Sequence, residues 1–457
     1  MVAFVLAIPS AIPSVAAATK AFPFPVERHQ LANGLQIAFV PYDSPGLVAY
    51  YTVMRVGSRN EPEAGRSGYA HFFEHMMFRG TKAHPADERD LTLTKLGVAG
   101  NAFTSSDMTV YHELGPTLAL PKMIALEADR FANLDYSEEA FKTEAGAILG
   151  EYAKSASSPG LKVHETMSET AFTTHTYRHT TLGYLDDIKA MPAGYAYARE
   201  FFRRYYTPDN AIVVVVGDFD KKATLAVMTK AYGDWKGKLD AAAITQEPEQ
   251  KEARRAHVEW STPTLSRVVI GWHANGASDH KSSAVQTVLA DYLFGPTSDL
   301  YRDLVLGRQL VDNIGGEGDQ SRDPGLFSVS ASVKQDKDLA EVERTIHAAI
   351  AKLASGEVDA ARLDAVRSHL KYGAILALDT ADSVAQTIAV NAAATADLDY
   401  LNVLYAAVDA LTAQDLVAFA KQSLVATNGT TVTLTAAAPK PAGTPKPTAP
   451  VKVGGGK

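Results

Sequence analysis

The chain contains no cysteine, and this absence removes several classes of protein at once. It excludes disulfide bonds, cysteine nucleophiles and thiolate metal sites, so any metal ion must be held by histidine and carboxylate side chains. Long apolar runs are also missing: after the N-terminal segment, no stretch reaches the about 18 apolar residues that span a bilayer. Basic residues are outnumbered by acidic ones, 44 to 52, and form no stripe. A phosphate-binding or nucleic-acid-binding surface is therefore not expected.

The length and the two ends of the chain suggest how it is divided. A chain of 457 residues is too long for one ordinary hydrophobic core, which predicts two or more domains. Residues 1–22 are apolar and contain Ala16-Ala17-Ala18, the A-x-A pattern of an export signal, although a basic leading segment is missing. We therefore expect an exported, periplasmic protein; the alternative is a disordered or membrane-touching N-terminus. The Pro-, Ala-, Lys- and Gly-rich residues 437–457 are expected to be a disordered tail.

Apolar patterning predicts an element order that occurs twice. The first copy consists of strands within 28–58, helices at about 67–79, 116–133 and 138–155, a buried strand at 211–216 and a helix at about 220–232. A polar linker, 236–256, follows, after which strand Arg267–Ala274 and a helix at about 281–294 repeat the opening order. The expected fold is α+β, with two related α/β-sandwich halves at 23–235 and 257–436. Each half should be a mainly antiparallel sheet with helices on one face.

One predicted helix, GYAHFFEHMMF, carries polar groups that its surroundings do not explain. At about 100° per residue, His71 and His75 lie about 40° apart, and Glu74 lies about 60° to the other side of His71. Every other residue from Tyr69 to Phe78 is apolar, so the helix should be buried nearly all round. Burying these three side chains is costly unless something satisfies them, and a divalent cation does so. A lone core histidine would be the ordinary interpretation, but H-x-x-E-H is the inverted form of the H-E-x-x-H zinc motif.

A catalytic zinc requires a third protein ligand, and the segment FKTEAGAILGEYAK offers two. Glu144 and Glu151 are seven residues apart and so about 20° apart around a helix. Taken alone, they could equally form the solvated rim of an amphipathic helix, so the spacing leaves the choice of ligand open.

Taken together, the motifs resemble the pitrilysin, or inverzincin, family of zinc metallopeptidases, which includes insulin-degrading enzymes and mitochondrial processing peptidases. The matching segments, in order, are GSRNEP, HFFEHMMFRGT, NAFTSSDMTVYHE, the E-x(6)-E pair and YYTPDNAIVVVVGDF. The resemblance implies one zinc ion per chain, bound by His71, His75 and Glu151, with Glu74 as the general base. It makes Glu144 a carboxylate that does not touch the metal but orients a ligand or supports the base.

The resemblance also assigns a role to Asn101, Ala102, Phe103 and Thr104. They are expected to form an edge strand beside the metal, to which a peptide substrate adds as another strand. The alternative is an ordinary strand that enters a turn at Ser105-Ser106-Asp107. A further histidine pair, His175 and His179, has no well-placed carboxylate, and no second metal site is expected there.

The expected activity is zinc-dependent endopeptidase hydrolysis of oligopeptides or small unfolded proteins inside a clamshell formed by two chains. The alternative is a non-catalytic peptide-binding or scaffold subunit of the same fold. A serine hydrolase is not expected, because the chain contains no G-x-S-x-G motif.

One departure from the family pattern concerns the partner chain. Active members carry an Arg and a Tyr in a segment reading roughly L-R, then a few residues, then G-L-A-Y. Here Val305 stands at the Arg position and Asp312 at the Tyr position. A shift of register that would use Arg302 and Tyr301 instead is left open. We therefore expect a heterodimer in which a related subunit supplies the Arg/Tyr pair.

Overall fold

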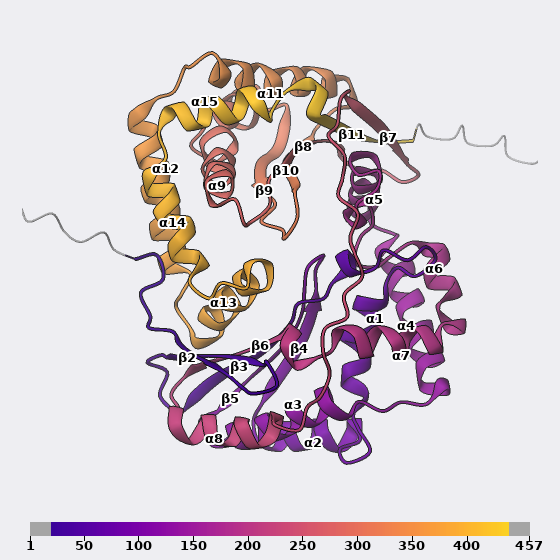
Figure 1. The fold of residues 1–457 in the computed structure, drawn as a ribbon. Helices are drawn as coiled ribbons and strands as arrows, with labels where there is room; N and C mark the ends of the chain where they lie inside the picture. The colour runs from indigo at the N-terminus through magenta and orange to yellow at the C-terminus, as the bar shows by residue number, and fades with distance from the viewer. Residues whose placement is uncertain (1–19, 438–457) are drawn as a thin grey trace, which may run out of the picture.

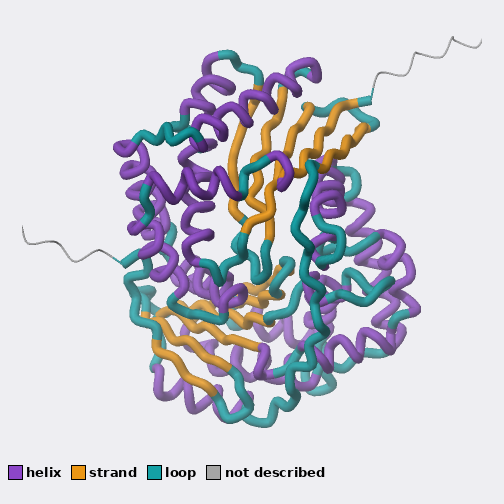
Figure 2. The backbone as a smooth tube through the Cα atoms, turned by 45° about the horizontal axis from the view of Figure 1, so that its top comes forward, coloured by secondary structure: helices purple, strands orange, loops and turns teal. Residues whose placement is uncertain are grey.

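The computed structural model describes residues 20–437 as two sheets with their helices (Figures 1 and 2). The expected cleavage sequence Ala16-Ala17-Ala18 lies outside the described residues, as does nearly all of the expected tail. Ala21 and Phe22, at the end of the expected signal, are buried, and the backbone N–H of Phe22 donates to Asn402 Oδ1 at 2.9 Å. The described chain therefore enters the fold at its first residues.

The N-terminal half is built on a six-stranded sheet in the order β1-β2-β6-β3-β5-β4. Its strands are β1 (Glu27–Gln30), β2 (Gln36–Pro41), β3 (Leu47–Met54), β4 (Ala99–Thr104), β5 (Thr109–Pro116) and β6 (Ala211–Gly217). All neighbouring pairs are antiparallel except β2 and β6, which are parallel. The central strands are rich in valine, isoleucine and tyrosine, whose side chains pack well on a pleated surface covered on both faces. Strand β4 forms one edge, as expected for Asn101–Thr104.

The C-terminal half repeats this topology in a five-stranded sheet ordered β7-β11-β8-β10-β9. Its strands are β7 (Arg254–Trp260), β8 (Ser266–Ala274), β9 (Val311–Gly318), β10 (Gly325–Val333) and β11 (Gly429–Ala436). Again one pair, β7 with β11, is parallel and the others are antiparallel. The expected pair of related, mainly antiparallel halves is confirmed. The exact domain boundaries stay a prediction, and β7 already begins inside the predicted linker.

One face of each sheet is covered by helices from the same half of the chain. In the N-terminal half these are α1 (Tyr69–Met76), α2 (Ala86–Lys95), α3 (Leu120–Asn133), α4 (Glu138–Ser155), α6 (Leu185–Ala190), α7 (Tyr195–Tyr205) and α8 (Lys221–Tyr232). In the C-terminal half they are α9 (His280–Phe294), α10 (Asp299–Tyr301), α11 (Leu339–Ala354), α12 (Ala360–Leu376), α14 (Tyr400–Ala410) and α15 (Ala413–Gln422). Each layer encloses its own apolar core.

The other face of each sheet is covered by a helix from the opposite half, which the sequence did not predict. Helix α13 (Ala381–Thr395) packs on β3 and β6 of the N-terminal sheet, and α5 (Pro159–Ala171) packs on β7, β8 and β11 of the C-terminal sheet (Figure 1). The contacts are apolar: Ile388 and Ala389 join Ala38, Tyr51 and Val214 in one cluster. Because each half completes the other, their relative position is set by buried surface.

A polar cluster at the junction of the halves holds the β4–β5 turn. Asp107, in that turn, accepts from Tyr177 Oη at 2.8 Å and from the backbone N–H of Arg322 at 2.9 Å. Asp323, in the β9–β10 loop, accepts from Arg59 Nε at 2.6 Å and contacts His175 Nε2 at 2.9 Å. Burial opposes the charge on Asp323, but the hydrogen bonds from His175 and Arg59 hold the pKa of its carboxyl well below the usual range. The hairpin that carries β4 is thus tied to the C-terminal half.

Within residues 20–437, no single helix is long and apolar enough to cross a membrane. Helices α14 and α15 meet the length and composition test only as a pair, with a bend of 101° between them. Both contribute buried side chains to the C-terminal core, among them Leu404 and Leu416.

The helix exchange predicts that the halves unfold together. Ala389→Leu adds volume at a fully buried contact between α13 and the N-terminal sheet, and should lower the free energy of unfolding by about 1–3 kcal/mol. Gln386→Leu, at an exposed position of the same helix, should change it by less than about 0.5 kcal/mol. Urea titration followed by tryptophan fluorescence and far-UV circular dichroism should give one coincident transition for each variant. Two separate transitions would contradict this coupling.

Candidate metal centre

Helix α1 begins where a buried carboxylate binds its first backbone groups. Glu61 accepts from the backbone N–H of Gly68 at 2.8 Å and of Ala70 at 2.6 Å. The first N–H groups of a helix lack partners within it, and a carboxylate satisfies them and complements the helix dipole. Burial raises the pKa of Glu61 to about 8, and these hydrogen bonds oppose that rise. Glu61, from the segment GSRNEP, therefore anchors the helix that carries His71, Glu74 and His75.

The structure brings His71, His75 and Glu151 together from α1 and α4. One ligand atom from each lies within 4.8 Å of the other two. Glu151 Oε2 is 3.7 Å from His71 Nε2 and 3.4 Å from His75 Nε2. Ligands about 2.0–2.1 Å from a tetrahedral zinc ion lie roughly 3.3–3.4 Å apart, and the two distances from Glu151 are close to this spacing. Glu151 is 41% exposed, which leaves the centre open on one side for a fourth ligand.

The surroundings shift the pKa values of the two histidines in opposite directions. Burial, together with the charge of His75, lowers the pKa of His71 to about 4, so this imidazole is neutral at neutral pH. The hydrogen bond that His75 donates to Glu144 raises the pKa of His75, against the effect of burial. Metals bind the neutral imidazole, and a carboxylate on the other ring nitrogen increases its basicity as a ligand. A metal ion would therefore meet a neutral imidazole at His71, whereas His75 holds its proton more tightly than a free imidazole does.

Glu144 contacts His75 on the ring nitrogen that faces away from the cluster. Glu144 Oε1 lies 2.9 Å from His75 Nδ1, which leaves His75 Nε2 directed at Glu151. The other oxygen, Glu144 Oε2, accepts from Arg79 Nε at 2.6 Å and also contacts the Arg79 Nη2 group. Despite burial, the hydrogen bonds from His75 and Arg79 lower the pKa of Glu144. Sequence reasoning missed Arg79, which lies four residues after His75 in the 3-10 turn Met77–Arg79 that follows α1.

Glu74 lies beside the cluster but is not part of it. Its Oε2 accepts from Thr104 Oγ1 at 2.6 Å, from the last residue of edge strand β4. Burial raises the pKa of Glu74, and the Thr104 hydrogen bond partly offsets that rise. A half-buried carboxylate with a raised pKa beside candidate metal ligands has the properties of a general base.

The remaining predicted residues lie on β4 and near the junction of the halves. Asn101 is exposed and Phe103 is half-buried, while Ala102 is buried in the core with α1. Their binding of substrate stays a prediction. His175 contacts Asp323 and His179 contacts the backbone oxygen of Thr180, so both have structural partners. Within residues 20–437, only His71, His75 and Glu151 form a group with metal-ligand spacing.

Comparison with known proteins shows to which protein family the chain is related. Residues 47–184 match the family model "Insulinase (Peptidase family M16)", and residues 194–370 match "Peptidase M16 inactive domain". The zinc protease PqqE of Helicobacter pylori is 31% identical over 366 residues, which cover 79% of this chain and 81% of the relative. This chain belongs to peptidase family M16. The second match begins near the end of the N-terminal half and extends into the C-terminal half, and its residues contain no H-x-x-E-H motif.

Solved M16 structures agree with the fold. A protease from Helicobacter pylori superimposes with a TM-score of 0.83 at 29% identity, covering 90% of this chain and all (100%) of the other. An M16-like peptidase from Alicyclobacillus acidocaldarius, at 20% identity, gives 0.80 over 91% and 99% of the two chains and supports the fold alone. The periplasmic protease PqqL of Escherichia coli gives 0.74 at 20% identity, and its match covers 90% of this chain but 47% of that one.

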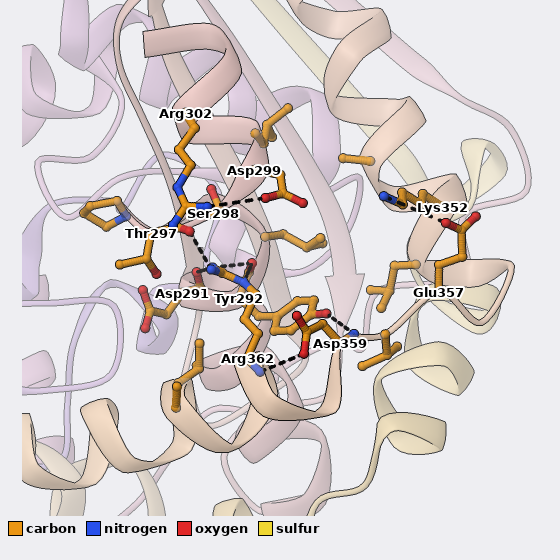
Figure 3. Close-up of a pocket in the computed structure, with 18 of the residues that line it drawn as sticks. Asp291, Tyr292, Thr297, Ser298, Asp299, Arg302, Lys352, Glu357, Asp359 and Arg362 are labelled. Atoms are coloured by element: carbon orange, nitrogen blue, oxygen red, sulfur yellow. Dashed lines mark hydrogen bonds and ion pairs between the residues drawn. The ribbon is translucent and has the colours of Figure 1, made fainter. Parts of the chain in front are cut away.

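One hollow of this M16 chain lies away from the candidate metal ligands. It has a volume of about 940 Å³ and is enclosed by α9, α10, α11 and α12 of the C-terminal half (Figure 3). Several of its charged groups are paired within the rim: Arg362 with the Tyr292 carbonyl, Lys352 with Glu357, and Arg302 with Asp299. No member of the metal cluster lines it.

The contacts of Glu144 predict its effect on metal affinity. Glu144→Gln should weaken zinc binding about 10- to 100-fold, because the His75 ring loses the carboxylate that orients it. Arg79→Gln should change affinity in the same direction by less, since Glu144 then keeps its contact with His75. Glu139→Gln, at an exposed position of α4, is the control. Competition with a zinc chelator measures the zinc affinity of all three variants. Unchanged affinity in Glu144→Gln would show that Glu144 does not orient His75 for metal binding.

Proposed function

We propose that this M16 chain is a zinc-dependent endopeptidase that hydrolyses oligopeptides or small unfolded proteins. The observation that carries the proposal is the convergence of His71, His75 and Glu151 on one point, with the half-buried carboxylate of Glu74 beside it. The naming of related M16 proteins as zinc proteases supports it.

Each residue has a distinct chemical task in this proposal. A zinc ion held by His71, His75 and Glu151 would lower the pKa of a water from about 15.7 towards about 7 and polarise the scissile carbonyl. Glu74 takes the proton of the attacking water and passes it to the leaving amine. Glu144 holds His75 in the tautomer whose Nε2 points to the cluster. Arg79 in turn orients Glu144.

The edge of the N-terminal sheet supports a preference for extended peptides. Strand β4 pairs with β5 on one side and ends the sheet on the other. Unpaired backbone groups along such an edge bind an extended chain with little dependence on its side chains. Selection by shape and length follows, and folded proteins, which offer no free strand, are poor substrates.

The partner is proposed to be a different, related chain. Gln309 adopts φ +54°, a left-handed conformation that favours glycine, and it stands where the family pattern has the Gly of G-L-A-Y. This backbone supports the register that puts Val305 at the Arg position and Asp312 at the Tyr position. Asp312 is exposed and, when ionised, has no proton to donate. Arg302 is also exposed and its nearest acidic partner is Asp299, 3.9 Å away.

Export to the periplasm remains part of the proposal. The related PqqL of Escherichia coli is described as a periplasmic protease. The N-terminal sequence has the apolar character and small-residue cleavage pattern of an export signal.

Separating metal binding from hydrolysis tests the assignment of roles. His71→Ala and Glu151→Ala should lose most bound zinc, because each removes one of three protein ligands. Glu74→Gln should keep zinc and fold but lose hydrolysis, because an amide cannot accept the proton. Zinc content by mass spectrometry and cleavage of a mixed peptide library check both. Near-normal turnover by zinc-loaded Glu74→Gln would contradict the mechanism.

A second test concerns the missing Arg/Tyr pair. The purified chain alone should bind zinc but hydrolyse peptides about 10²–10³-fold more slowly than with a partner that supplies the pair, the usual cost of lost transition-state donors. Introducing Val305→Arg together with Asp312→Tyr should raise the rate of the isolated chain. Robust activity of the unmodified chain with no second protein present would overturn the heterodimer.

A further inference from the structure

Thr104 is the residue through which the edge strand reaches the base. Its Oγ1 donates to Glu74 Oε2 at 2.6 Å, across the gap between β4 and α1. We propose that Thr104 is a positioning residue that orients the Glu74 carboxylate and couples this orientation to substrate pairing at β4. The inference rests on the proposed peptidase function and adds a residue to its machinery.

The alternation of β4 gives Thr104 this side-chain direction. Successive side chains of a strand point to opposite faces, so Ala102 and Thr104 share one face while Asn101 and Phe103 share the other. Ala102 is buried in the core that contains α1, which identifies the face towards the helix. Phe103 packs with the cluster on the opposite face of the sheet. Among Asn101–Thr104, Thr104 alone combines a hydroxyl with the α1-facing direction.

The backbone N–H and C=O groups of Thr104 point in a different direction from its side chain. The Ser105 N–H donates to the Met108 carbonyl at 2.8 Å, closing the β4–β5 turn. The next pair, Thr104 with Thr109, is then a non-hydrogen-bonded pair of the antiparallel ladder. In such a pair the N–H and C=O groups point away from the partner strand, here to the open edge of the sheet. One residue therefore offers its backbone to an incoming peptide and its side chain to Glu74.

A hydrogen bond to one oxygen helps a general base, because a carboxylate has two equivalent oxygens and rotates freely about its last bond. The bond fixes the plane of the carboxylate. With Oε2 bound to Thr104, Glu74 Oε1 is left to receive the proton, in a fixed plane. Threonine is suited to this task because its branched Cβ restricts χ1 and so fixes the position of the hydroxyl. A small misplacement of a catalytic group can cost about 10²-fold in rate.

The hairpin that carries Thr104 is itself held in place. The backbone N–H groups of Ser58 and Arg59 donate to the carbonyls of Ser105 and Ser106 at 3.4 and 2.8 Å. Asp107, in the same turn, is bound from both halves of the molecule. The end of β4 is therefore a rigid support, from which a single hydroxyl can define the orientation of the base.

The test compares Thr104→Val, which removes the hydroxyl and keeps the shape, with Thr104→Ser, which restores it. Thr109→Val is the matched control, because Thr109 lies opposite on β5 and its hydroxyl donates to the Val56 carbonyl, away from Glu74. With enzyme in excess over a quenched fluorescent peptide, the single-turnover rate of Thr104→Val should fall about 10- to 100-fold. Thr104→Ser should recover most of that loss, and Thr109→Val should match the unmodified chain.

Two further measurements separate positioning from a structural role. Zinc content should be the same in all variants. In a Glu74→Gln background, Thr104→Val should leave the affinity for the same peptide unchanged, because the backbone edge is intact. Lost zinc, weakened peptide binding, or a full rate in Thr104→Val would each overturn the inference. If Glu74→Gln hydrolyses peptides normally, the proposed function itself fails; if Glu74→Gln is inactive while Thr104→Val is normal, only the role of Thr104 fails.

Discussion

The burial of helix α1 with two imidazoles and a carboxylate on it is the constraint on which the rest of the centre depends. An apolar helix can be buried on nearly all sides only if its polar groups find partners. Two of them do so: His75 contacts Glu144, and Glu74 accepts from Thr104. The buried Nδ1 of His71 has no hydrogen-bond partner, and its Nε2 lies 3.7 Å from Glu151. The helix is anchored at its start by Glu61. The arrangement proposed for catalysis thus also gives partners to most of the polar groups that this helix brings into the core.

Rigidity around the centre comes from elements that are distant in the chain. The exchange of α5 and α13 means that neither sheet is complete without the opposite half. The cluster around Asp107 and Asp323 then joins the β4–β5 turn to the β9–β10 loop. If β4 receives a peptide as proposed, it must not move relative to Glu74 and the candidate metal ligands, and these contacts hold it in place.

The two halves share a topology but differ in chemistry. Both sheets have one parallel pair in the same place, and α1 and α9 occupy corresponding positions in the element order. Helix α9 carries no H-x-x-E-H motif. Of these two related halves, one carries the candidate metal ligands, and both contribute to the shared interface. The site belongs to particular side chains rather than to the fold.

Local sequence properties determined a large part of this description. The absence of cysteine restricted the metal donors to imidazole and carboxylate, and the helical period placed His71, Glu74 and His75 on neighbouring faces. Helix α4 was predicted at Glu138–Ser155, as found, and the repeated order of elements predicted two related halves. Each of these conclusions depends on periodicity or on residue type, which a chain carries within a few turns of helix or strand.

The tertiary structure alone decided the rest. Glu144 and Glu151 share one flank of α4, so their spacing could not tell which of them faces the metal ligands. The crossing of α4 over α1 puts Glu151 beside both Nε2 atoms and Glu144 behind His75. Tertiary packing also determines the contacts of Arg79 with Glu144 and of Thr104 with Glu74. It likewise determines which sheet each of the exchanged helices α5 and α13 covers. Contacts between residues tens to hundreds of positions apart depend on how the elements pack, and no local period in the sequence encodes that packing.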